Sequence, residues 1–332
     1  MVDAHLSQAS YDQFGRRIEY LRISVTDRCN FRCIYCMPEH GLDWIPRDEL
    51  LTDDEIVRVV EQFAPVGLRR LRITGGEPTI RPGLPALIRR LRAVDGIEDI
   101  SLSTNGVRLP ELAVALREAG LDRVNISADS LLPDRIAAMA RRRLPFHPID
   151  AARTAYASGL APIKLNVVLI RGVNDDEIEA FARLTLREPW HVRFIELMPV
   201  GELGATGLER VVPSDEVLAR IAALGVLTPD VGPSRGNGPA SYYRLDGAAG
   251  TIGVITPMTH TYCGSCNRVR LTADGRLRTC LYGDHEVALR PALRAGMDLL
   301  PLYREALAGK PREHDLIHVR VGGLRALSQV GG

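Results

Sequence analysis

Short apolar, β-branched runs recur along the first 200 residues, and most are followed by a stretch whose apolar residues repeat every three or four positions. The runs predict strands at residues 21–25, 70–74, 100–103, 124–127, 163–169 and 192–198. The helical periodicity predicts helices at residues 52–63, 84–94, 110–119, 149–158, 174–186 and 215–223. Thr52 and Glu55 have capping-box spacing, and Ser214 is the predicted N-cap of the last helix.

Six strand-then-helix units predict an α/β fold with a parallel sheet. Eight such units would close a full barrel, so six predict a partial (β/α)6 TIM-like barrel. The Gly/Pro/Ser-rich stretch PDVGPSRGNGPA at residues 229–240 interrupts the pattern. We therefore expect a barrel domain at residues 1–230 and a smaller C-terminal domain at 231–332, which carries the last three cysteines.

Composition narrows the class of protein. The chain of 332 residues is 45% hydrophobic and 25% charged, which is typical of a folded globular protein. Lys and Arg number 42 and Asp and Glu 41, so net charge gives no reason to expect a nucleic-acid or membrane partner. No apolar run is long enough to span a bilayer, and the polar N-terminus does not resemble a signal peptide, so we expect a cytoplasmic protein.

The first cysteine group directly follows the first predicted strand. Cys29, Cys33 and Cys36 have the spacing C-x3-C-x2-C. A [4Fe–4S] cluster usually takes four thiolates, so three would leave one iron open to a small molecule. A structural zinc ion needs four closed ligands, and His40 does not stand at a usual zinc spacing. This pattern therefore favours a catalytic cluster over zinc or three unrelated buried thiols.

This group resembles the signature of the radical S-adenosylmethionine (SAM) superfamily, in which an aromatic residue, here Tyr35, precedes the last cysteine. Gly75-Gly76-Glu77-Pro78, at the end of the second strand, resembles the superfamily's turn that holds the SAM amino group. Glycines allow a close approach to a ligand, and exposed carbonyls and Glu77 would suit an ammonium. Taken alone, this stretch could be an ordinary tight turn. The resemblance implies that SAM is bound by Tyr35, Gly76, Glu77, Ser127 and Met198.

The second cysteine group comprises Cys263, Cys266 and Cys280, with the spacing C-x2-C-x13-C. Three thiolates again suit a [4Fe–4S] cluster with an open iron. A zinc site made of these cysteines and His260 fits the spacing equally well.

Several strands carry cations on one face, since residues two apart in a strand point the same way. Arg70 and Arg72 share a face with Thr74, Arg22 with Ser24, and Lys164 with Asn166. If the apolar faces pack on helices, the cations point into the barrel, where they need an anion such as a triphosphate. The alternative is outward snorkelling or pairing with Asp and Glu.

The whole pattern resembles the GTP 3′,8-cyclase family, also called molybdenum cofactor biosynthesis protein A. The stretches that carry the resemblance are LRISVTDRCNFRCIYCMP at 21–38, RITGGEP at 72–78, STNG at 103–106, KLNVV at 164–168, RFIELMP at 193–199 and CGSCNRVRL at 263–271, with Cys280. The resemblance implies two [4Fe–4S] clusters and SAM as cofactors. It implies conversion of GTP to (8S)-3′,8-cyclo-7,8-dihydroguanosine 5′-triphosphate, the first step of molybdopterin biosynthesis, through abstraction of the ribose H3′ by a 5′-deoxyadenosyl radical.

The resemblance and the strand pattern together predict the substrate site. The residues expected to bind GTP are Arg22, Arg70, Arg72, Ser103, Lys164, Arg193, Arg268 and Arg270, with Arg22, Arg268 and Arg270 expected to act in catalysis. Gly331-Gly332 resembles the family's terminal di-glycine, which reaches toward the active site, although a frayed terminus is the simpler interpretation.

The expected partners are GTP, a one-electron donor that the sequence does not identify, and the next molybdopterin-pathway enzyme, with the chain as a monomer or homodimer. Two alternatives stay open at this point. One is a radical SAM maturase of another substrate with an auxiliary cluster. The other is a non-catalytic Fe–S or zinc sensor, which would need no SAM site.

Overall fold

A single curved sheet organises the chain. The computed structural model describes residues 10–198, 207–231, 238–314 and 326–331. In this part of the chain, twelve strands pair in the order β12-β11-β10-β1-β2-β3-β4-β5-β6-β9-β8-β7. Their bounds are β1 Tyr20–Ser24, β2 Arg70–Thr74, β3 Asp99–Thr104, β4 Arg123–Ser127, β5 Lys164–Leu169, β6 His191–Glu196, β7 Leu227–Pro229, β8 Ser241–Leu245, β9 Thr251–Ile255, β10 Arg268–Leu271, β11 Arg276–Arg278 and β12 Glu286–Ala288.

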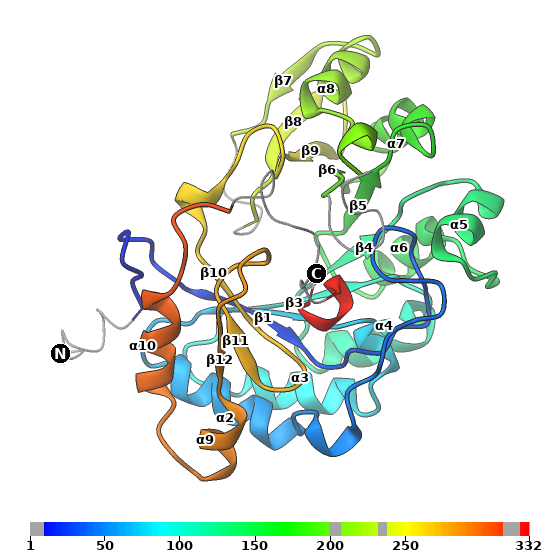
Figure 1. The fold of residues 1–332 in the computed structure, drawn as a ribbon. Helices are drawn as coiled ribbons and strands as arrows, with labels where there is room; N and C mark the ends of the chain where they lie inside the picture. The colour runs from blue at the N-terminus through cyan, green and yellow to red at the C-terminus, as the bar shows by residue number, and fades with distance from the viewer. Residues whose placement is uncertain (1–9, 199–206, 232–237, 315–325, 332) are drawn as a thin grey trace.

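The six predicted strands are β1 to β6, and each pairs in parallel with the next. The predicted partial barrel is therefore confirmed. The sequence pattern did not reveal that the C-terminal part of the chain extends this sheet on both sides. β10 pairs in parallel with β1, and β9 pairs in parallel with β6. Figure 1 shows the sheet curving from β12 round to β7.

Helices follow most of the parallel strands. They are α2 Asp53–Phe63, α3 Leu84–Arg92, α4 Leu109–Glu118, α5 Pro133–Ala140, α6 Pro148–Ala157, α7 Ile178–Leu184, α8 Ser214–Ala222, α9 Arg290–Arg294 and α10 Leu300–Ala308. The capping box of α2 is confirmed, because Thr52 and Glu55 exchange both hydrogen bonds. The N-cap prediction for Ser214 is wrong. Pro213 holds that position, and the Ser214 amide donates to the Glu196 carboxylate at 3.1 Å.

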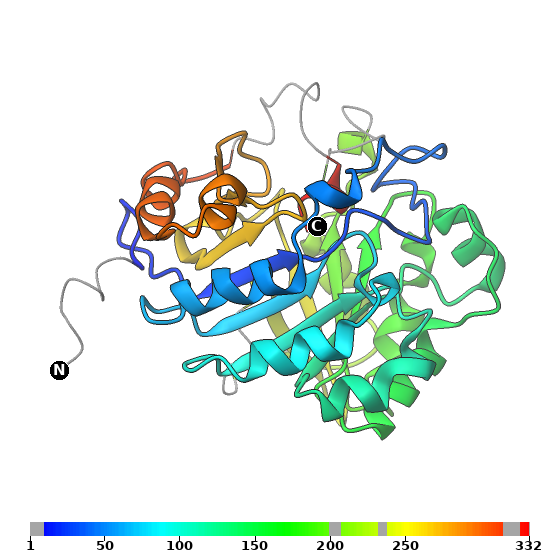
Figure 2. The same cartoon turned by 90° about the horizontal axis from the view of Figure 1, so that it is seen from below.

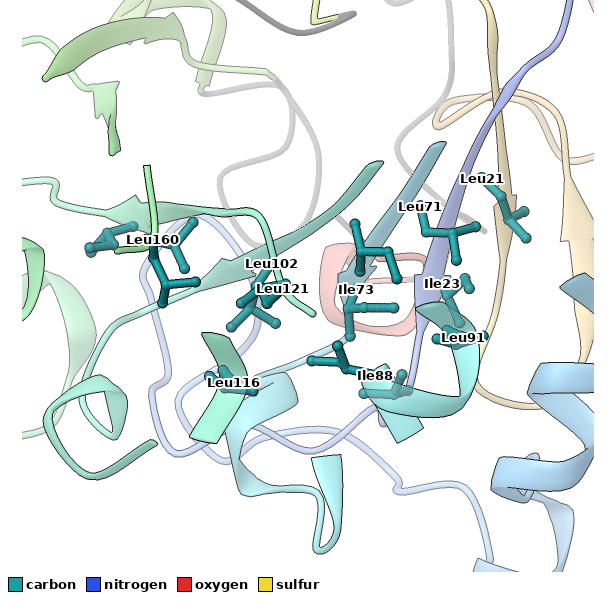
Figure 3. Close-up of a cluster of buried hydrophobic side chains, with 14 of the residues drawn as sticks. Leu21, Ile23, Leu71, Ile73, Ile88, Leu91, Leu102, Leu116, Leu121 and Leu160 are labelled. Atoms are coloured by element: carbon teal, nitrogen blue, oxygen red, sulfur yellow. The ribbon is translucent and has the colours of Figure 1, made fainter. Parts of the chain in front are cut away.

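The core lies between the sheet and these helices. Leu21 and Ile23 of β1 and Leu71 of β2 are fully buried, as are Ile88 and Leu91 of α3. Figure 3 shows these side chains pointing toward one another from the strands and the helix. Figure 2 shows α2, α3 and α4, in blue to cyan-green, covering this face of the sheet. The apolar face of each strand is thus used for packing, which leaves the opposite face for the polar residues.

Within the described ranges, no helix has the length and apolar character needed to cross a bilayer. Gly332 and residues 232–237 of the predicted interdomain stretch lie outside the described ranges.

Candidate active site

The first cysteine group lies in the loop after β1 and faces a cavity at the ends of the parallel strands. Cys29, Cys33 and Cys36 all line this cavity. Gly76 from the end of β2 and Ser127 from the end of β4 line it too. Residues from three separate parts of the sequence therefore meet at one place, which is where barrel folds assemble their active sites.

The glycine turn is pressed against the loop that leads to Cys29. The Gly76 amide donates to the Thr26 carbonyl at 2.7 Å, and the Glu77 amide to the Arg28 carbonyl at 2.8 Å. A Cβ atom on Gly76 would lie 2.1 Å from the Arg28 carbonyl oxygen, so glycine is required there by the neighbouring backbone. The turn therefore positions the cysteine loop.

Glu77 lines the cavity, but its carboxylate already accepts hydrogen bonds from neighbouring groups of the protein. It accepts hydrogen bonds from the amides of Thr79 and Asn105 and from the hydroxyls of Thr79 and Thr104. Burial raises the pKa of Glu77, and these donors oppose that rise. The geometry thus gives no support to Glu77 as the group that meets an ammonium, whereas the backbone of the turn lines the cavity.

The chemistry of the three thiols fits a metal cluster. Burial raises the pKa of Cys29 to about 12 and that of Cys36 to about 11, and it raises the pKa of Cys33 well above its usual range. Such thiols ionise when a positively charged metal centre stabilises the thiolate. The Phe31 amide also points at the Cys29 sulfur at 3.4 Å, and the Ser328 backbone bonds Cys36. These residues would hold the cluster that the radical SAM signature implies.

Asp129 connects the cysteine loop to the barrel, and the sequence analysis missed it. The Tyr35 hydroxyl donates to Asp129 Oδ2 at 2.7 Å, and the Val168 amide donates to Oδ1 at 2.9 Å. Burial raises the pKa of Asp129 to about 6. Its place two residues after Ser127, just past β4, was the available signal. This carboxylate fixes Tyr35 against the ends of β4 and β5.

A second cavity adjoins the first and carries the cations. The two share Tyr35, Ser103, Ser127, Asp129 and Leu327 as lining residues. The second cavity encloses about 1190 Å³ outside protein atoms, open solvent included, which is ample for a nucleotide. Among its described lining residues are five arginines, Arg22, Arg72, Arg193, Arg268 and Arg270, and Asp129 is the one carboxylate.

Three of these arginines stand in one row across the sheet. Arg22 of β1 is in register with Arg270 of β10 on one side and with Arg72 of β2 on the other. Burial lowers the pKa of Arg22 well below its usual range, and the charges of Arg270 and Arg72 add to this effect. Adjacent buried guanidinium groups repel one another, so an anion bound between them would stabilise the row.

Several buried polar atoms around the same cavity would suit a polar ligand. Arg72 Nε, Arg193 Nε and Asn166 Oδ1 are buried and have no hydrogen-bond partner among the described residues. Buried polar groups are nearly always paired in a complete structure. The Arg72 guanidinium also donates to Ser103 Oγ at 3.5 Å and lies 5.6 Å from the centre of the Tyr20 ring.

Two predicted cations stand apart from this cavity wall. Arg70, at the start of β2, forms an ion pair with Glu19. Lys164, at the start of β5, is 2% exposed. Neither is among the residues that line the two cavities. Met198 does line the second cavity, where the Tyr282 hydroxyl contacts its sulfur.

The second cysteine group lies beside the arginine cavity. Cys263 and Cys280 adjoin two of its lining residues, Tyr262 and Leu281. Burial and the nearby sulfurs of Cys280 and Cys266 raise the pKa of Cys263. For Cys266, burial opposes ionisation, but the charges of Arg268 and Lys310 outweigh it and lower the pKa to about 7. A cluster at these three sulfurs would therefore lie beside the residues that line the arginine cavity.

The zinc alternative needs His260, which lies elsewhere. His260 Nε2 is 3.6 Å from Asp215 Oδ2, and both side chains are largely exposed. Among the residues that the structure describes, no three His, Cys, Asp or Glu side chains are grouped so as to hold one metal ion.

The end of the chain reaches the arginine row. The carbonyl oxygen of Gly331 accepts hydrogen bonds from Arg22 Nε at 3.0 Å and from Arg270 Nη1 at 2.5 Å. Leu327 and Ser328, in the short turn η6 (Leu327–Gln329), line the first cavity between the cysteine loop and the strands (Figure 1, red). The described tail is thus packed into the site.

Comparison with known proteins agrees with this geometry. Residues 23–185 match the Radical SAM superfamily, and residues 190–316 match Molybdenum Cofactor Synthesis C. The fold resembles that of the Streptococcus suis protein SuiB bound to precursor peptide SuiA, with a TM-score of 0.61 and 14% identity over 91% of this chain and 67% of that one.

Close relatives cover nearly the whole chain. A GTP 3′,8-cyclase from Pelotomaculum thermopropionicum is 49% identical over 97% of this chain and 99% of its own length. The GTP 3′,8-cyclase of Listeria welshimeri is 45% identical over 97% of this chain and 98% of its own length. With the cysteine loop, the glycine turn and the arginine row in place, this chain belongs to the GTP 3′,8-cyclase family of radical SAM enzymes.

Proposed function

We propose that this enzyme binds SAM in the cysteine-lined cavity and GTP in the arginine-lined cavity, and converts GTP to its 3′,8-cyclised 7,8-dihydro isomer. The observation that carries the proposal is the shared wall of the two cavities, formed by residues such as Ser103 and Ser127. A reactive group formed in one cavity has direct access to a ligand held in the other.

The cofactors, when bound, supply an electron and the 5′-deoxyadenosyl radical that removes H3′ from the ribose of GTP. Carbon C3′ then joins C8 of guanine, and one electron with one proton completes the product. The hydrogen lost from C3′ is replaced by the added proton, so the product has the composition of GTP.

The arginine row holds the triphosphate in this proposal. Arg22, Arg72 and Arg270 lie side by side and together offer a fixed set of charge-assisted donors. Arg193 adds a buried guanidinium from the β6 side of the cavity. Holding a reactant in attack geometry can contribute about 7–11 kcal/mol toward a barrier in favourable cases. Arg268, whose guanidinium lies 5.1 Å from the centre of the Tyr262 ring, is the proposed contact to the guanine end.

Lys164 and Arg70 stay predicted contacts to GTP, although neither lines the two described cavities. Tyr35, fixed by Asp129, and Gly76 and Ser127 are the proposed contacts to SAM. Met198, which lines the arginine cavity, is a further proposed contact to SAM.

Cys29, Cys33 and Cys36 are the proposed ligands of the first [4Fe–4S] cluster, and Cys263, Cys266 and Cys280 those of a second. All six cysteines are free thiols in the structure. Free thiols and oxygen-sensitive clusters suit a reducing compartment, so we place the activity in the cytoplasm. An unidentified one-electron donor and the next enzyme of molybdopterin synthesis complete the proposed set of partners.

Anaerobic reconstitution, followed by SAM, a reductant and each nucleoside triphosphate in turn, tests this function. We expect 5′-deoxyadenosine and a new isomer of GTP by mass spectrometry with GTP alone. Equal turnover of ATP, or 5′-deoxyadenosine without a nucleotide product, would contradict the proposed substrate.

A further inference from the structure

Lysine is almost absent from this chain, and both lysines are buried. Of its 42 Lys and Arg residues, 40 are arginines, and the two lysines are Lys164 and Lys310. Each is only 2% exposed, whereas arginine supplies the cation in the surface ion pairs with Asp176, Glu216 and Glu179. An ammonium is a compact point charge and a guanidinium is a planar fork, but both carry the same positive charge. Lys310 is therefore one of two positions where this chain uses a buried ammonium.

The surroundings of Lys310 match a protonated amine. Its Nζ atom lies 2.5 Å from the Thr279 carbonyl oxygen, 3.0 Å from the Arg268 carbonyl oxygen and 3.5 Å from the sulfur of Cys266. An ammonium has three N–H donors, and here three acceptors surround it. A neutral amine would have only two donors for the three acceptors.

The end of α10 holds this lysine in place. Lys310 follows the helix after Gly309, and its amide donates to the Leu307 carbonyl at 3.1 Å. The Gln13 side chain donates to the Lys310 carbonyl at 3.2 Å. A Cβ atom at Gly309 would lie 2.4 Å from the His285 ring, so the chain passes this point as tightly as glycine allows. The constrained backbone at Gly309 therefore holds the Lys310 ammonium close to the sulfur of Cys266.

Other charged groups face the same cysteines. Arg268 also bonds the Cys266 sulfur. Arg16, paired with Asp12, donates to the Cys263 carbonyl at 2.8 Å. Glu313 is the acid whose charge acts on Cys263. Cys266 therefore lies between two cations, and Lys310 is the one that does not line the cavity where GTP is proposed to bind.

We propose that Lys310 is a positioning residue for the second cluster: its ammonium holds the Cys266 thiolate by a hydrogen bond and makes the cluster easier to reduce. The inference rests on the proposed second cluster. Net charge and hydrogen bonds to sulfur are two of the properties that set the potential of a protein-bound cluster. A fixed positive charge beside the sulfur favours the form that carries one more electron.

The test uses full-length protein carrying Cys33→Ala, so that the spectroscopic signal comes from the second cluster. Lys310→Met removes the charge at similar length, Lys310→Arg keeps it, and Arg304→Met removes an exposed cation from the same helix. We expect Lys310→Met to lower the reduced-to-oxidised ratio at a fixed potential at least tenfold, about 59 mV for a one-electron couple. Lys310→Arg should stay within about threefold of the parent, and Arg304→Met should match it.

The proposal would be overturned if Lys310→Met retained the cluster iron and the midpoint potential of the second cluster did not change. If Lys310→Met loses the cluster, Lys310→Arg decides the matter, because recovery of iron with the charge supports the role and equal loss refutes it. A parent protein without any second-cluster signal would remove the proposed second cluster itself, and this inference with it. The failure of the inference alone is therefore distinguishable from the failure of the proposed function.

Discussion

Arg22 donates from Nε to the carbonyl oxygen of Gly331 at 3.0 Å, although 309 residues separate the two in the chain. The end of the protein therefore supplies an acceptor to the middle of the arginine row. A bound triphosphate would compete for the same donor. A substitution at Gly331 therefore tests whether the tail matters for turnover of GTP.

Gly331→Ala should impair cyclisation. Gly331 has φ +69°, and a Cβ atom there would lie 2.8 Å from Thr74 Cγ2. We expect GTP turnover to fall at least tenfold, while reductive SAM cleavage without GTP continues. Gly247→Ala is the matched control, because Gly247 also has φ +69° but has open space around it. It should cost about 1 kcal/mol of stability and leave turnover unchanged. Equal turnover in the two variants would contradict a role for the tail.

Arg72→Met should weaken GTP binding. A charge-assisted hydrogen bond contributes about 1.5–3 kcal/mol, so we expect the dissociation constant to rise roughly tenfold to a hundredfold by calorimetry. Arg90→Met, which removes an exposed cation paired with Asp54 on the outer helices, serves as the control. A wild-type dissociation constant in Arg72→Met would exclude this guanidinium from the triphosphate site.

Substitutions in the two cysteine groups should impair different steps of the reaction. Cys29→Ala should abolish 5′-deoxyadenosine formation, because the SAM-binding cluster loses a ligand. Cys266→Ala should leave some SAM cleavage and abolish the cyclised nucleotide. Iron analysis should give about eight irons in the parent and about four in each variant. Cyclised product at the parent rate from either variant would show that the altered cluster is not needed.

The apolar strand faces should carry the stability of the barrel. Leu71 is fully buried between β2 and the helices, so Leu71→Ala should lower the free energy of unfolding by about 2–5 kcal/mol. Val114, on α4, is 60% exposed. Val114→Ala should therefore change the free energy of unfolding by less than about 0.5 kcal/mol. Denaturant melts of both variants check this, and equal midpoints would contradict the assignment of faces.

The barrel strands and their faces could be predicted because a two-residue alternation is local information. Arg22 faces the cavity and Leu21 the core for that reason. The first cysteine loop could be predicted from spacing, since its three cysteines lie within eight residues of one another. Ser103, Arg193 and Arg270 meet in the second cavity because the parallel register brings distant strands side by side.

Other features depend on contacts between distant parts of the chain. The pairing of β9 and β10 with the barrel carries no local signal, nor does the approach of Lys310 to Cys266. The role of Asp129 depends on hydrogen bonds from Tyr35 and Val168, which lie 94 and 39 positions away in the sequence. The Ser214 N-cap was predicted wrongly because Ser214 is the first residue of the helix and Pro213 is its N-cap, while the amide of Ser214 donates to Glu196, which is remote in sequence.

The central claim is that a radical formed beside the cysteine loop reaches the ribose of a GTP molecule held by the arginine row. The most direct measurement uses GTP carrying deuterium at C3′, with reconstituted enzyme, SAM and reductant under anaerobic conditions. Mass spectrometry of the 5′-deoxyadenosine should reveal one deuterium transferred from the nucleotide, together with a cyclised product that has lost it. Unlabelled 5′-deoxyadenosine accompanied by a product that keeps the deuterium at C3′ would contradict the account.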